Sequence, residues 1–291
     1  MSEDPFSDHF SFARPLGPGE EGNCAFFGQN VLQGLTDGID DFAHERQPRW
    51  ERRTHRIGAP VLLGCSPWIT DDALLVAIAK LPGACLILNK APRRKRDPEA
   101  LQKLHELNEQ TSGVPLRALS GLSHKAPKIA GRPQIMGPYD AVDPEVQLPT
   151  FRTIGYRKTT NVQPPIAHAK LALLGDICWT DEDPVGGVTD YIWFSPKRLW
   201  VSSANFTYGS RQSLEFGYWT EHTELMKSVQ SFLVSLIGVS EDLDAAADTP
   251  DPELADIEYD DHAMAEAAAE SYQARVEMAE INGEEFNEDE L

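Results

Sequence analysis

Residues 165–176 read PIAHAKLALLGD, and this stretch predicts a buried strand that carries two chemically active side chains. It is apolar and is bounded by a Pro-Pro pair and a Gly-Asp pair, which is typical of a short strand inside a sheet. Side chains alternate between the two faces of a strand, so His168 and Lys170 are expected to point the same way. An imidazole and an ammonium group therefore lie side by side on one face of the predicted strand.

A second apolar stretch, residues 199–206 with the sequence LWVSSANF, predicts a neighbouring strand. Ser203 and Asn205 share a face of it by the same alternation. Two adjacent strands would then place an imidazole, an ammonium group, a hydroxyl and a carboxamide around one small space. A nucleophile or base beside three donors suits a phosphate group. An isolated His-x-Lys pair is usually incidental, but the Ser-x-Asn pair and the later Glu215 favour a site.

The five residues together resemble the signature of the phospholipase D superfamily, the HKD enzymes. That signature is H-x-K-x4-D, followed by G-S/G-x-N and a downstream Glu or Asp. The matching residues are His168, Lys170, Ser203, Asn205 and Glu215. The resemblance implies a nucleophilic histidine that forms a phosphohistidine, with lysine and asparagine holding the phosphate oxygens. It also implies a glutamate that orients the imidazole, an auxiliary serine donor, and no metal or other cofactor.

This chain departs from the signature in three places. Asp176 lies one residue later than the signature aspartate, and Gly175 stands in its place, so at most a structural role is expected for Asp176. Ser202 replaces the glycine before the serine. The connection between the two strands, which includes residues 181–187, is longer than is usual in the family and is expected to form a loop near the site.

The resemblance extends upstream and implies the fold class. Residues 60–68 predict a strand, residues 70–72 can cap a helix over 73–81, and residues 84–89 predict the next strand. This resembles the opening βαβ unit of such a domain. We therefore expect an α/β fold: a phospholipase D-like mixed β-sheet flanked by helices, in a single HKD domain with an acidic C-terminal tail.

The rest of the chain supplies further helices and the expected domain bounds. Apolar residues at helical spacing predict helices over residues 30–43, 98–110 and 223–237, and a short strand is predicted at 114–119. Residues 120–164 are rich in Gly and Pro and are expected to be a long excursion before the catalytic strand. The expected divisions are an irregular N-terminal arm (1–22), a phospholipase D-like domain (23–239) and an acidic, partly helical or disordered tail (240–291).

Composition narrows the class of protein. No run of about 18 apolar residues is present, so no transmembrane helix is expected. The N-terminus lacks the basic and apolar regions of a signal peptide, which predicts a cytoplasmic protein. The four cysteines are far apart and form no C-x-x-C pair, so we expect buried reduced thiols rather than a metal site or disulfides. Those cysteines are Cys24, Cys65, Cys85 and Cys178.

The net charge of −20 is concentrated at the C-terminal end. Residues 240–291 hold 19 acidic residues and one basic residue, so the remainder of the chain is nearly neutral. Two basic runs lie in that remainder, one formed by Arg93, Arg94, Lys95 and Arg96 and one spread over residues 46–56. Either they are solvated surface segments, or they form a track that binds a polyanionic substrate near the site.

The acidic tail has three interpretations. It could keep the protein soluble, mimic a polyanion that occupies the basic runs, or provide a docking helix for a protein partner. The Ala- and Glu-rich residues 261–281 are expected to be helical, and residues 240–261 to be a linker.

The resemblance also implies a quaternary structure and a substrate class. The family needs two motifs, the second histidine acting as general acid, and this chain has one H-x-K. A homodimer that brings two copies of His168 together is expected. Single-motif relatives are mostly nucleases, often in restriction or phage-defence modules. We expect a metal-independent phosphodiesterase, most readily a nuclease acting on DNA rather than RNA. The alternatives are a hydrolase or transferase of phospholipids or other phosphodiesters, and a non-catalytic nucleic-acid-binding or regulatory subunit.

Overall fold

The computed structural model describes residues 11–15, 23–45, 49–50, 55–90, 98–140, 143, 146–155, 167–182, 189–245 and 250–282. The chain divides into two compact units. The larger unit comprises residues 1–123 and 144–253 and contains the predicted site. The smaller unit comprises residues 124–143 and 254–291. These divisions differ from the expected bounds at 22/23 and 239/240.

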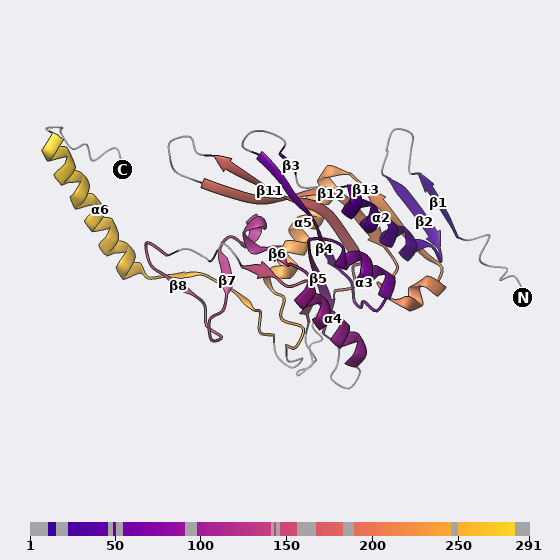
Figure 1. Ribbon diagram of the computed structural model, residues 1–291. Helices are drawn as coiled ribbons and strands as arrows, with labels where there is room; N and C mark the ends of the chain where they lie inside the picture. Colours follow the sequence, from indigo (N-terminus) through magenta and orange to yellow (C-terminus); the bar gives the residue numbers. More distant parts are fainter. Residues whose placement is uncertain are drawn as a thin grey trace, which may run out of the picture. The chain divides into compact units, whose positions relative to one another are not determined.

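One mixed sheet forms the centre of the larger unit (Figure 1). Its strand order is β1-β2-β13-β12-β11-β4-β5-β10, and β3 pairs with β4. Strands β4, β5 and β10 are parallel, and the other pairs are antiparallel. The strands are β1 (Phe12–Pro15), β2 (Cys24–Gly28), β3 (Arg49–Trp50), β4 (His55–Cys65), β5 (Gly83–Asn89), β10 (Phe151–Ile154), β11 (Leu171–Glu182), β12 (Thr189–Ser202) and β13 (Glu215–Thr220). The expected mixed α/β sheet is confirmed.

Helices flank this sheet. They are α2 (Val31–Glu45), α3 (Asp72–Ala79), α4 (Pro98–Gln110) and α5 (Thr223–Gly238). Apolar spacing predicted α2, α4 and α5, and the capping residues predicted α3. The first three bury their apolar residues in one cluster with alternate residues of the strands, including Ala172, Leu174 and Trp200. Helix α5 packs against β4, β11 and β12 with residues outside that cluster. The strands are thus covered on two sides, which explains their continuous apolar sequences.

Strands β11 and β12 form a long antiparallel hairpin that corrects one prediction. Leu171 pairs with Val201 at one end, and Glu182 pairs with Thr189 at the other. The connection between the strands was expected to lie near the site. Its residues 181 and 182 belong to β11 instead, and the Glu182–Thr189 pair is about 35 Å from Leu171 at the usual rise per residue. Residues 183–188 lie outside the described residues. The extra residues lengthen the two strands because their β-branched and aromatic side chains favour pairing.

Strand β10 lies within the segment that was expected to be an irregular excursion, residues 120–164. It pairs in parallel with β5 at the edge of the sheet. The same segment contributes η3 (Ser120–Leu122), a turn of 3₁₀ helix, and β9 (Gln147–Leu148), which pairs with β6 (Val114–Pro115). The strand that was predicted at 114–119 is limited to β6, because the chain turns into the 3₁₀ helix η2 (Leu116–Ala118). The β10 sequence FRTI is short and carries a charge at its centre, so its pattern did not indicate a buried strand.

That charge, Arg152, is completely buried and binds the segment that follows α5. Its Nε donates to Ser240 Oγ at 2.6 Å, and its Nη1 donates to Glu253 Oε2 at 2.6 Å. Lys90, also buried, donates to Glu241 Oε2 at 2.5 Å. The start of the acidic segment is therefore part of the larger unit and neutralises two buried cations, where the sequence predicted a linker.

The smaller unit is built from two short strand pairs and a helix. Strand β7 (Lys125–Pro127) pairs with β14 (Leu254–Asp256), and β8 (Ile135–Met136) pairs with β15 (Glu258–Tyr259). Helix α6 (Asp261–Asn282) follows and is largely exposed on all sides among its described side chains. The predicted helix over residues 261–281 is confirmed.

Two general expectations can be compared with the described residues. The four cysteines are unpaired, and all except the half-buried Cys24 are buried. Among the described helices, none has the length and apolar character needed to cross a membrane.

The buried pair of Lys90 and Glu241 predicts a large loss of stability when one partner is removed. Glu241→Ala removes the carboxylate from a buried ion pair, and we expect the free energy of unfolding to fall by about 3–5 kcal/mol. Urea denaturation measures it. The matched control is Glu224→Ala, which breaks the exposed pair of Glu224 and Lys227 and should cost less than about 1 kcal/mol. Equal losses for the two variants would contradict a structural role for Glu241.

Candidate functional site

The H-x-K motif lies immediately before β11, and not within the strand as its alternating pattern suggested. Residues 167–170 have no regular structure, and β11 begins at Leu171. The motif is nevertheless fixed against the end of β12, because Ser202 N donates to Lys170 O at 3.1 Å. Residue 203, just beyond β12, is therefore opposite residue 169, between the two side chains of the motif. The structure brings the two predicted motifs to one end of the sheet.

His168 and Lys170 contact each other directly. Lys170 Nζ lies 3.0 Å from His168 Nδ1. An ammonium group only donates hydrogen bonds, so Nδ1 is the acceptor in this contact. The Lys170 residue is only 7 % exposed, whereas His168 is exposed. Within the part of the chain that the structure describes, no carboxylate pairs with Lys170, and a buried cation without a counter-ion is costly.

Ser203 and Glu215 form a second pair, one strand further along. Ser203 Oγ donates a short hydrogen bond to Glu215 Oε2 and accepts one from Phe216 N at 3.0 Å. Ser203 N donates to Phe216 O at 2.8 Å, which continues the β12–β13 ladder past the end of β12. The resemblance implied that Glu215 orients the imidazole. In this structure the carboxylate is held by Ser203, and its role toward His168 stays a prediction.

Asn205 is half-buried at the same end of the sheet. Its Oδ1 atom is buried and has no hydrogen-bond partner among the described residues. Buried polar atoms in folded proteins are nearly always paired, so an unpaired amide oxygen indicates a group that is satisfied by something else. A carboxamide presents a donor and an acceptor from the same position by rotating about its terminal bond.

Cys65 lies beside the motif and could be mistaken for a nucleophile. Its Sγ donates a weak hydrogen bond to Ala169 O at 3.8 Å. Burial raises the pKa of the Cys65 thiol to about 12, although the Leu171 backbone and the Lys170 charge act in the opposite direction. The thiolate is the reactive form of cysteine, so Cys65 is inert near neutral pH. Cys65 is therefore no candidate nucleophile, and the role of His168 as nucleophile stays a prediction.

Asn89 holds the residue before His168 and is not among the site residues that were predicted from the sequence. Asn89 Nδ2 donates to Ala167 O at 2.9 Å, and Ala167 N donates to Asn89 Oδ1 at 2.9 Å. The side chain thus pairs with a backbone as a neighbouring strand would, and it fixes the chain at the start of the H-x-K motif. The signal in the sequence was a single polar residue at the end of an otherwise apolar strand.

Arg211 holds the loop between Asn205 and Glu215. This residue lies in η4 (Tyr208–Gln212) and makes two hydrogen bonds to the Asp71 carboxylate, at 2.5 and 2.8 Å. Asp71 also caps α3 by accepting from Leu74 N at 2.9 Å. Burial alone would raise the pKa of Asp71, but the bonds from Arg211 and from the helix end outweigh it and lower that pKa.

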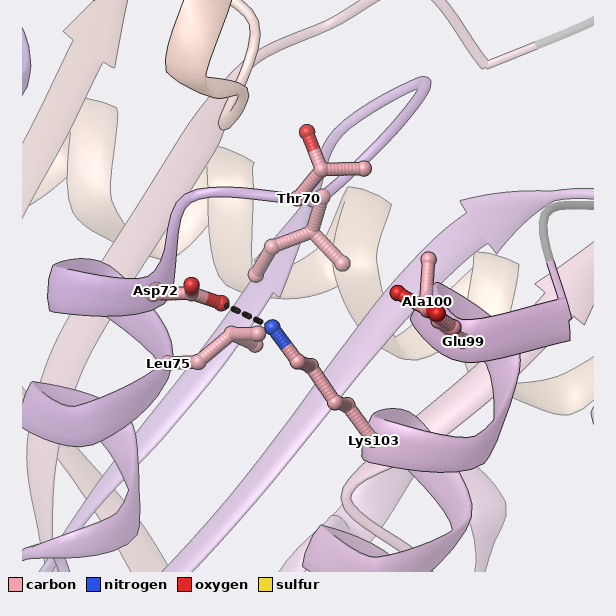
Figure 2. A pocket seen from close by; sticks show the side chains of 7 residues that line it. Thr70, Asp72, Leu75, Glu99, Ala100 and Lys103 are labelled. Atoms are coloured by element: carbon pink, nitrogen blue, oxygen red, sulfur yellow. Dashed lines mark hydrogen bonds and ion pairs between the residues drawn. The ribbon is translucent and has the colours of Figure 1, made fainter.

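A small pocket opens beside this loop, between the first turns of α3 and α4 (Figure 2). In Figure 2 the Lys103 side chain reaches across to Asp72, and the two atoms Nζ and Oδ1 are 2.8 Å apart. Glu99 adds a second carboxylate to the lining. Two carboxylates against one ammonium do not suit a phosphate, so the pocket is no extension of the proposed anion site.

The remaining predicted residues are placed as follows. Asp176 is fully buried in the middle of β11, where it is paired with Pro60 and Ser195, well along the strand from His168. The predicted substrate-binding residues Arg93, Arg94, Lys95 and Arg96 lie outside the described residues. In the described ranges, no group of three or more His, Cys, Asp or Glu side chains is arranged to hold a metal ion.

The clamp of Asn89 on Ala167 predicts a local loss of order. Asn89→Ala leaves the Ala167 N–H and C=O groups unpaired, and we expect a loss of about 1–3 kcal/mol of stability with faster amide exchange over residues 167–170. Hydrogen exchange followed by mass spectrometry measures it. Asn108 makes the same two-bond clamp on Phe151 in β10 and provides the control. Asn108→Ala should speed amide exchange around residue 151 and leave residues 167–170 unchanged. If the two variants showed the same exchange rates at residues 167–170 and at residue 151, Asn89 would not be the clamp of the H-x-K motif.

The pair of Asp71 and Arg211 predicts a pH dependence of stability. Because the folded state lowers the Asp71 pKa, the carboxylate stabilises the fold above the unfolded pKa of about 3.9. That contribution is lost as the pH falls through the lower folded value. Between pH 7 and pH 3 the wild type should therefore lose more stability than Asp71→Asn, by thermal denaturation at matched ionic strength. Parallel curves for the two proteins would refute the linkage.

Comparisons with known proteins find solved structures of similar fold but no similar sequence. No protein-family model matches the sequence, and no curated protein matches it significantly. Among solved structures, NucT from Helicobacter pylori is similar, with a TM-score of 0.43 and 12 % identity over 76 % of this chain and 98 % of NucT. Nuc from Salmonella typhimurium, a phospholipase D family member, is similar with a TM-score of 0.35 and 11 % identity over 73 % of this chain and 93 % of Nuc. A phospholipase D family member is thus among the solved structures that this chain resembles.

Proposed function

We propose that the chain is a metal-independent phosphodiesterase whose site is formed by His168, Lys170, Ser203, Asn205 and Glu215. The observation that carries the proposal is the buried Lys170 ammonium, which has an imidazole beside it and no described carboxylate to pair with. An anion completes such a site, and the unpaired Asn205 amide lies at the same end of the sheet. A phosphate group supplies the anion that Lys170 lacks, and the Asn205 Nδ2 group can donate to a phosphate oxygen, whereas Oδ1 is an acceptor that needs a donor.

The hydrogen bond between Lys170 and His168 has to break before the imidazole can attack phosphorus. With Nδ1 accepting from Lys170, the proton of a neutral imidazole lies on Nε2, which then has no lone pair to attack phosphorus. A bound phosphate draws the ammonium to its own oxygens and releases Nδ1. The proton can then reside on Nδ1, toward a carboxylate such as Glu215, and Nε2 becomes the nucleophile.

The reaction then proceeds in two displacements. His168 attacks phosphorus, an N–P bond forms, and the bond from phosphorus to the leaving alcohol breaks. Lys170 and Asn205 stabilise the charge on the phosphate oxygens. The leaving oxygen takes a proton from a general acid, which we assign to His168 of a second copy of the chain, because one chain carries one motif. The histidine of the second copy, now deprotonated, then takes a proton from water as that water attacks the phosphohistidine. The N–P bond breaks and His168 is restored.

Among phosphodiesters, we favour a nucleic acid as the substrate and DNA over RNA, as the resemblance implies. A restriction or phage-defence module is the setting that the same resemblance suggests, with a cytoplasmic location. The second candidate is a non-catalytic phosphate-binding subunit. It is favoured by the hydrogen bond that Ser203 Oγ donates to Glu215. That bond engages the carboxylate that was expected to orient the His168 imidazole. Docking of a partner through the acidic C-terminal segment is compatible with either function.

The test is hydrolysis in the presence of EDTA. Purified protein is given bis(p-nitrophenyl) phosphate, single-stranded DNA, duplex DNA, RNA and phosphatidylcholine vesicles. We expect turnover of the small diester and of nucleic acid, and a loss of at least about 10³-fold for His168→Ala, since the nucleophile is removed. Light scattering should give twice the chain mass of 32.3 kDa.

The control is Ser231→Ala, on an exposed face of α5, which should retain full activity. Activity that vanishes in EDTA and returns with magnesium would overturn the metal-independent mechanism. Binding of inorganic phosphate without any turnover would establish the non-catalytic alternative. Hydrolysis of the phosphatidylcholine vesicles but not of nucleic acid would show that the substrate is a phospholipid.

A further inference from the structure

A row of aromatic side chains crosses the edge of the main sheet and ends at the proposed site. Phe12 pairs with Phe27 across β1 and β2, and Phe27 pairs with Phe216 across β2 and β13. Ser203 N in turn donates to Phe216 O, and Phe216 N donates to Ser203 Oγ. One line of register therefore passes through Phe12, Phe27 and Phe216 and reaches the serine of the candidate site.

The rings of this row are in contact. The centroids of Phe12 and Phe27 are 4.7 Å apart in a stacked arrangement, and those of Phe27 and Phe216 are 5.0 Å apart. Tyr218, two residues along β13, adds a fourth ring at 5.7 Å from Phe216. We call these four residues the aromatic row. At about 4.8 Å per strand, Phe12 is about 14 Å from Ser203.

The row keeps exposed surface that a purely structural cluster would bury. Phe12 and Phe216 are each 40 % exposed. The side chains next to the row along the strands, Phe26 in β2 and Trp219 in β13, point to the other face and pack in the core with α2. Helix α5 packs against β4, β11 and β12, further along the sheet. Cross-strand aromatic pairs do stabilise sheets, but that role does not need rings open to solvent.

A cation accompanies the rings. The guanidinium of the exposed Arg14 lies 5.2 Å from the centre of the Phe12 ring. Exposed rings interleaved with a cation, in line with an anion site, have the chemistry of a surface for single-stranded nucleic acid. Bases stack on the rings and phosphates pair with the cation. A duplex would hide its base faces from such a row.

We propose that the aromatic row is a stacking platform that holds the bases of single-stranded nucleic acid beside the scissile phosphate. The proposal rests on the proposed function for the identity of the phosphate site, and it narrows the substrate class to single strands. Its occupant is an unpaired strand and not a second copy of the chain, because the exposed Arg14 places positive charge beside the Phe12 ring, where it suits a phosphate backbone.

The test compares binding of two fluorescent single strands of equal length, one normal and one with abasic sugars throughout. His168→Ala is used so that no cleavage occurs. The normal strand should bind at least about tenfold more tightly than the abasic strand, since base stacking on one ring is worth about that much. Phe12→Leu and Phe27→Leu, which keep an apolar side chain but remove the ring, should each reduce this preference and leave the abasic affinity unchanged.

Phe232→Leu is the matched control, because Phe232 is an exposed phenylalanine on α5 and outside the row. It should keep the full preference for the normal strand. Equal binding of normal and abasic strands by His168→Ala would overturn the proposal, even if the wild type hydrolyses the diester. Variants that convert a dimer to monomers, with the preference for bases intact, would assign the row to an interface between copies. Because the readout is binding, a failure of hydrolysis would overturn the proposed function alone.

Discussion

The register between β11 and β12 determines where the candidate site residues lie. The hydrogen bond from Ser202 N to Lys170 O fixes the H-x-K motif against the S-x-N motif, although neither side-chain pair lies within a strand. A slip of one residue would turn every apolar side chain of β11 to the other face of the sheet. Because both faces are packed, burial of residues such as Leu173 and Leu174 enforces the same register that assembles the site.

The site is held by residues that carry no chemistry of their own. Asn89 pairs with the backbone before His168, and Arg211 ties the loop after Asn205 to the cap of α3. The chemically active groups can therefore sit on irregular backbone and still be kept in place, since each flank is fixed to a strand or a helix. Preorganisation of this kind is what catalysis by positioned charges requires.

Helices and central strands could be predicted from the sequence because their apolar spacing is regular. The five motif residues could also be singled out, because their types and order are distinctive, and the structure places both motifs at one end of the sheet. Their roles remain predictions. Strand β10 was missed because Arg152 interrupts a four-residue pattern, and its buried partners lie far away in the chain. The acidic residues after α5 read as a linker because no local pattern reveals that Glu241 faces a buried lysine.

The buried ion pairs also impose an order on how the larger unit can be completed during synthesis. Lys90 precedes its partner Glu241 by 151 residues, and Arg152 precedes Glu253 by 101. At about 5–20 residues per second, the ribosome needs roughly 8–30 s to make the intervening chain after Lys90. Strands β4 and β5 are available throughout that interval, but Glu241, which pairs with the cation at the end of β5, emerges only when the interval ends. Closure of the sheet around β10 is thus a late event that awaits the chain beyond α5.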